Sequence, residues 1–198
     1  MISGTALWYA SRATGVISLI LLSIVAILGI AVNRQGRLPG LPRFAVTGLH
    51  RSLSLLTVAF LGTHIVTAIA DGYVHIPWLS TIVPFSSSYE RFWIGLGTVA
   101  VDMTAAVIVT SLLRARLRPA VWRAVHWLAY ASYPVTLVHS MGASKDLRSG
   151  WLLALTMATV FAVVTAIGYR VIDASAAIPR PRRVPQQLVR IEQARSLR

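Results

Sequence analysis

The hydrophobic residues of this chain are gathered into five long runs, separated by short segments rich in arginine, proline or serine. A helix that spans the hydrocarbon core of a bilayer needs about 20 mostly apolar residues. Five segments reach this length: 14–32, 46–70, 92–113, 121–141 and 150–172. All five are expected to be helices, because an open sheet cannot satisfy its backbone hydrogen bonds in lipid. The pattern therefore predicts an all-α membrane protein with five transmembrane helices.

The composition agrees with this interpretation. Of the 198 residues, 56% are hydrophobic and only 13% are charged, and the mean hydropathy is +0.67. A net charge of +13 could suggest a nucleic-acid partner, but the arginines lie between and after the apolar runs, as in basic cytoplasmic loops. We therefore expect contact with lipid and none with nucleic acid. The chain has no cysteine, which excludes disulfides and iron–sulfur clusters within it.

The basic segments also predict the orientation. They are the segment with Arg34, Arg37 and Arg43, the turn with Arg114, Arg116, Arg118 and Arg123, and the arginine-rich tail. The positive-inside rule places them in the cytoplasm and the N-terminus outside, in a multi-pass protein of the cell membrane. Segment 71–91 would then be an outer cap with turns. We expect residues 1–173 to form the transmembrane domain, and the basic tail 174–198 to be partly disordered near the inner leaflet.

Four of the five histidines lie inside two of the apolar runs. His50 and His64 are fourteen residues apart in the second run, and His126 and His139 are thirteen apart in the fourth. Histidine inside a membrane is costly and usually marks function. Fourteen residues span about 21 Å of helix and return within about 40° of the starting direction. His50 and His64 should therefore share a helix side at two membrane levels.

Both histidine-bearing runs are predicted to cross in the same direction. His50 would then share the inner level with His126, and His64 the outer level with His139. Each level offers two facing imidazoles, which suits an iron porphyrin with two axial histidines, whereas zinc would need more ligands. Thirteen ideal helical steps leave His139 about 140° from His126. We expect the fourth helix to bend or rewind, with Pro134 as the candidate cause.

These spacings, with the run WRAVHWLAY followed by VH and the preceding turn VTSLLRARL, resemble the ferric reductase-like transmembrane domain. That superfamily includes NADPH oxidases, ferric reductases and the membrane haem subunit of a bacterial methionine sulfoxide reductase system. The resemblance covers about residues 12–173. It implies a dihaem helical bundle with two haem b groups, the inner held by His50 and His126 and the outer by His64 and His139.

The resemblance also implies a function: a b-type cytochrome that passes electrons from a cytoplasmic flavoprotein to an acceptor outside. No glycine-rich nucleotide fingerprint follows the fifth run, so neither a flavin nor a nicotinamide site is expected in this chain. The donor would be a separate protein. Two alternatives stay open: a quinol-linked dihaem cytochrome b subunit, and a scaffold or small transporter without redox chemistry. The sequence leaves the acceptor, the oligomeric state and any enzymatic activity of its own undecided.

Several further residues are candidates around the haem sites. Arg12 at the outer level, and Arg51 and Arg123 at the inner level, could bind the anionic haem propionates, as guanidinium groups do. The glycines two residues before His50 and His64 could let a macrocycle or a helix approach closely. Asp102, in the middle of the third run, could have a structural role or lie on a proton path. His75, in the outer loop, is expected to be a solvated side chain.

Overall fold

The computed structural model describes residues 4–33, 42–72 and 74–176. Over these ranges the chain is helical and contains no strand. The α-helices are α1 (Gly4–Asn33), α2 (Arg43–Ala70), α3 (Arg91–Leu112), α4 (Pro119–His126), α5 (Leu128–Ala143) and α6 (Gly150–Ala176), with short 3₁₀ helices η1 (Trp78–Thr81) and η2 (Asp146–Arg148). The predicted all-helical architecture is confirmed for this part of the chain.

Four helices of the described residues are long and apolar enough to cross a membrane: Thr5–Val32, Phe44–Ala70, Arg91–Leu112 and Gly150–Ile172. They agree with four of the five predicted spans. The first begins about ten residues earlier than predicted, so Arg12 lies inside α1 rather than before it. The chain is a membrane protein, and large apolar side chains that remain exposed, such as Val66, Leu112 and Phe161, fit surfaces that face lipid.

The predicted fourth span is two helices instead of one. α4 ends at His126, α5 begins at Leu128, and Trp127 between them belongs to neither. The amide of Tyr130 donates to the carbonyl of Trp127 at 3.0 Å, which is the tighter i to i+3 pattern of a 3₁₀ turn. Pro134 lies inside α5, so the interruption is at Trp127 and not at this proline. A bend of α5 at Pro134 stays a prediction.

Hydroxyl side chains along the long helices bond back onto their own backbone. Ser18 donates to the carbonyl of Thr14 at 2.7 Å, and Thr57 to that of Leu53 at 2.7 Å. These bonds satisfy polar side chains that lipid could not solvate. Polar positions can therefore occur in the spans without an outside partner.

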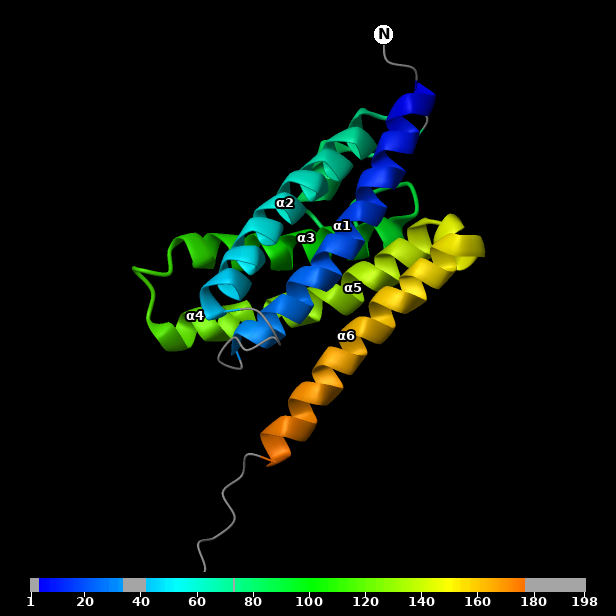
Figure 1. Cartoon of the computed structure of the whole chain (residues 1–198). Helices are drawn as coiled ribbons and strands as arrows, with labels where there is room; N and C mark the ends of the chain where they lie inside the picture. The colour runs from blue at the N-terminus through cyan, green and yellow to red at the C-terminus, as the bar shows by residue number, and fades with distance from the viewer. Residues whose placement is uncertain (1–3, 34–41, 73, 177–198) are drawn as a thin grey trace, which may run out of the picture. The chain divides into compact units, whose positions relative to one another are not determined.

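The helices pack mainly in two pairs, α1 with α2 and α3 with α5, and α5 also contacts α1 (Figure 1). A buried cluster of Leu19, Tyr133, Leu147 and Val163 joins α1, α5, η2 and α6. These contacts all lie in the first of two units into which the chain divides, residues 1–166 and 167–198. The predicted domain boundary at residue 174 stays a prediction, and residues 177–198 of the predicted tail lie outside the described residues.

Residues 74–90, between α2 and α3, form η1 and turns, in agreement with the predicted loop with turns. The hydroxyl of Thr98 donates to the carbonyl of Ser80 in η1, and Nε of Arg91 donates to the carbonyl of Phe85 at 2.6 Å. Phe85 has a φ of 62°, and an alanine Cβ built at Gly95 would lie 2.1 Å from its ring. The absence of a side chain at Gly95 thus gives room for this loop against α3.

Candidate functional site

The four histidines of the spans come from three helices. His50 and His64 lie in α2, His126 is the last residue of α4, and His139 lies in α5. All four side chains are half-buried, in contrast to the exposed His75 of the loop. A half-buried imidazole at a helix interface needs partners for its polar atoms.

Three of the four imidazoles donate a hydrogen bond to the backbone of a neighbouring helix. Nδ1 of His64 donates to the carbonyl of Ser11 at 2.7 Å, and Nδ1 of His139 to that of Trp93 at 2.7 Å. Nδ1 of His50 donates to the carbonyl of Val25 at 3.2 Å. A carbonyl can only accept, so Nδ1 carries the proton and Nε2 keeps its lone pair. This is the tautomer of a histidine that binds metal through Nε2.

The structure brings two of the histidines to one cavity: His64 of α2 and His139 of α5 both line it. The pairing of His50 with His126 stays a prediction.

The cavity at His64 and His139 has a volume of about 940 Å³. Sites for small molecules and cofactors typically occupy about 300–1,000 Å³ and are mostly apolar with a few placed polar groups. Side chains from α1, α2, α3, α5 and α6 line this one, among them Leu22, Leu61, Ile65, Val101 and Leu155. Its size and apolar walls suit a large hydrophobic group.

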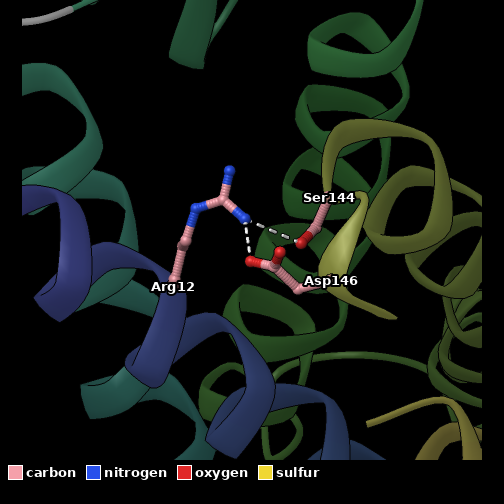
Figure 2. A network of polar contacts seen from close by, with 3 residues as sticks. All are labelled: Arg12, Ser144 and Asp146. Carbon is pink, nitrogen blue, oxygen red and sulfur yellow. Dashed lines mark hydrogen bonds and ion pairs between the residues drawn. The ribbon is translucent and has the colours of Figure 1, made fainter. Parts of the chain in front are cut away.

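Arg12 lies in the lining of this cavity and already has an anionic partner (Figure 2). Its Nη1 forms an ion pair with Asp146 and donates to the hydroxyl of Ser144 at 3.1 Å. The guanidinium also lies 4.0 Å from the ring centre of Trp8. A guanidinium has five N–H donors, and Figure 2 shows both contacts at one terminal nitrogen. Propionate binding by Arg12 stays a prediction.

The other predicted polar residues lie apart from this network. The side chains of Arg51 and Arg123 are exposed. Asp102 is exposed on α3, and His75 lies beside Ser88 and Tyr89 in the loop. The roles suggested for them stay predictions. Within the described ranges, no three His, Cys, Asp or Glu side chains gather where they could hold a metal ion.

His126 is held differently from the other three histidines. Its ring stacks on Trp122, with centroids 4.8 Å apart and planes at 24°, and the guanidinium of Arg114 lies 4.4 Å from the Trp122 ring centre. Nδ1 of His126 and Nε1 of Trp122 are both buried without a hydrogen-bond partner. Trp122 was missed by sequence reasoning, although its position four residues before His126 places the two on one helix face.

Gly48 and Gly62, suggested for the close approach of a helix or a macrocycle, are not approached by another helix, and a macrocycle beside them stays a prediction. An added Cβ at Gly48 or Gly62 would meet nothing within 4 Å. The glycines that touch the imidazoles lie on the neighbouring helices: Gly15, Gly29 and Gly97. The sequence contained a signal for two of them: Gly15 and Gly29 are fourteen residues apart, the same spacing as His50 and His64.

Comparison with protein families gives a match that agrees with this geometry. The family described as ferric reductase like transmembrane component matches residues 14–137. The matched segment includes His50, His64 and His126 and ends two residues before His139, so it is shorter than the resemblance expected from the sequence. Neither the curated proteins nor the solved structures contain a match. Because the family match covers more than half of the 198 residues, the chain belongs to the ferric reductase-like transmembrane family.

Proposed function

We propose that this chain is a membrane-embedded, b-type dihaem cytochrome that passes electrons from a cytoplasmic flavoprotein to an extracytoplasmic acceptor. Family membership indicates a membrane redox component. The observation that carries the finer proposal is the state of the histidines. Three of them donate Nδ1–H to a backbone carbonyl of another helix and so keep Nε2 available for iron.

The residues present fit a haem at the His64–His139 pair. The two imidazoles share a cavity of about 940 Å³ with mostly apolar walls, and Arg12 in its lining could meet a propionate. His50 and His126, the second pair, would hold the second haem. Haem, when bound, supplies one-electron redox chemistry at its iron. The chain's own contribution is to orient the imidazoles, increase their basicity through the Nδ1 bonds, and exclude water with apolar side chains.

The orientation and the partner are part of the proposal. The arginine-rich segments would face the cytoplasm, so that the His50–His126 pair lies on the donor side and the His64–His139 pair on the acceptor side. The donor would be a flavoprotein that docks at this face of the cell membrane. The α4–α5 segment would be the fourth of five crossings, with its turn at Trp127.

The decisive experiment is to purify the protein from membranes and measure haem by the pyridine haemochrome assay. We expect two haem b per chain and the spectrum of six-coordinate, low-spin iron. Replacing His139 by alanine should remove one haem and replacing His50 the other, while His75→Ala, an exposed loop histidine, should keep both. A colourless wild-type protein would favour a scaffold or transporter instead. Faster reduction by a quinol than by a flavin reductase would favour the quinol-linked alternative.

A further inference from the structure

Each of the three hydrogen-bonded histidines meets its neighbouring helix in the same way. The accepting carbonyls belong to Ser11, Val25 and Trp93. The residue four positions later is a glycine in every case, and the imidazole lies against that glycine: His64 on Gly15, His50 on Gly29 and His139 on Gly97. The same contact therefore recurs three times, on two different helices.

The helix geometry explains why the glycine stands four residues after the carbonyl. A backbone carbonyl in an α-helix accepts from the amide four residues later and keeps a second lone pair. The side chain at that later position leans back over the preceding turn, because Cα–Cβ bonds tilt toward the helix N-terminus. It would cover the carbonyl from the side on which the imidazole approaches. Glycine leaves this side open.

The distances show how little room there is. An alanine Cβ at position 97 would lie 2.7 Å from Cε1 and 2.8 Å from Nδ1 of His139. At position 15 it would lie 3.0 Å from both corresponding atoms of His64, and at position 29 it would lie 3.4 Å from Cε1 of His50. An imidazole is rigid, so it must move as a whole, and the 2.7 Å bonds of His64 and His139 would lengthen or break.

We propose that Gly15, Gly29 and Gly97 are positioning residues for the iron ligands, each keeping open the backbone carbonyl that orients one imidazole. This inference rests on the proposed function, because it assigns the orienting contacts of the same haem sites. Their effect is on the direction of Nε2 and on the basicity of the ligand, since both depend on the Nδ1 bond.

The fourth histidine marks the limit of this pattern. Fourteen residues after Gly97 comes Ser111, and fourteen after Trp93 comes Val107. The carbonyl of Val107 accepts from the hydroxyl of Thr110 at 3.2 Å, and Nδ1 of His126 has no hydrogen-bond partner. The two haem sites are therefore unequal: the His64–His139 pair has two carbonyl-bonded ligands, and the His50–His126 pair has one.

The test compares Gly15→Ala, Gly29→Ala and Gly97→Ala with Gly168→Ala. Gly168 is a matched control, because it also lies inside a helix but an added Cβ meets nothing within 4 Å. The readouts are haem per chain, the g-values of the low-spin ferric signals by electron paramagnetic resonance, and the midpoint potentials. Gly97→Ala is expected to halve the haem content, because the haem at His64–His139 is lost. Gly15→Ala is expected to shift the g-values of that same haem and to raise its midpoint potential. Gly29→Ala is expected to shift the g-values and the potential of the haem at His50–His126 by a smaller amount. Gly168→Ala should match the wild type.

A second comparison separates positioning from simple helix packing. The thermal stability of Gly97→Ala is measured in the wild type and in a His139→Ala background, where the clashing ring is gone. Destabilisation in the first background alone supports the inference, and equal destabilisation in both overturns it. Unchanged haem content, g-values and potentials in Gly97→Ala, with two haems in the wild type, would also overturn the inference while the proposed function stands. A wild type without haem would overturn both.

Discussion

Replacing Gly142 by alanine is expected to disturb the packing that fixes His139. Gly142 lies near the end of α5, and an added Cβ would lie 1.9 Å from Cε3 and 2.1 Å from Cδ2 of Trp93 on α3. The carbonyl of the same tryptophan accepts the Nδ1 bond of His139. Each helix thus inserts a ring against the other: Trp93 on Gly142, and His139 on Gly97.

The size of the effect follows from these contacts. Carbon atoms pack at about 3.5–4.0 Å, so the indole must retreat by roughly 1.5–2 Å. Overpacking of this kind costs about 1–3 kcal/mol, and loss of a hydrogen bond adds about 0.5–1.5 kcal/mol. Together they predict a free energy of unfolding lower by about 2–4 kcal/mol. For a chain of this length, that lowers the midpoint of thermal unfolding by roughly 5–15 °C.

The assay is thermal unfolding of the purified protein in detergent, with Gly168→Ala as the control substitution in open space. Trp93→Leu in the Gly142→Ala background removes the clashing ring and should recover part of the lost stability. Equal unfolding midpoints for Gly142→Ala and Gly168→Ala would show that the indole does not lie on Gly142. The reasoning about the α3–α5 contact would then be refuted.

Three further predictions concern single contacts. Trp122→Ala should reduce the haem proposed at His126 and leave the other haem intact, because the imidazole of His126 is oriented by stacking on Trp122 and not by a hydrogen bond at Nδ1. Spectra that resolve the two haems test this prediction, and equal loss of both haems would contradict it. Asp146→Asn removes the ion pair with Arg12, and since both side chains are partly exposed the loss should be no more than about 1 kcal/mol in a thermal melt. Ser11→Ala should change the unfolding midpoint and the haem content little, because Nδ1 of His64 bonds to the backbone carbonyl of Ser11 at 2.7 Å and lies 3.4 Å from its hydroxyl. A large loss of haem or of stability would mean that the hydroxyl is the real partner.

Four of the spans could be read from the sequence because a span depends on local pattern. Four runs of apolar residues end within a few residues of the helices that they predict, except at the start of α1. Lipid leaves a chain few backbone choices, so length and hydropathy are sufficient. His50 and His64 are fourteen residues apart, and helical periodicity alone predicts that they share one side of α2. Both imidazoles do lie against glycines of α1.

The interruption at Trp127 could not be placed from sequence. The separation of thirteen residues from His126 to His139 implies about 3.25 residues per turn if the two rings are to share a helix side after four turns. That value lies between the α-helix and the 3₁₀ helix. The sequence therefore indicated that this helix is wound more tightly than an α-helix, but Pro134 was the only obvious candidate for the cause. The structure puts the 3₁₀ turn at Trp127, directly after the histidine, and leaves Pro134 inside α5.

Hydropathy alone thus determined that this chain enters a membrane as helices, and spacing predicted that its imidazoles are paired at two levels. Only the packing of α1 on α2 and of α3 on α5 decided which carbonyl each imidazole meets, which glycine leaves that carbonyl open, and that Arg12 pairs with Asp146. The physical reason is the range of the contacts. Helix formation and burial in lipid depend on neighbours in sequence, whereas the orientation of these side chains depends on atoms of another helix, 25 to 134 residues away.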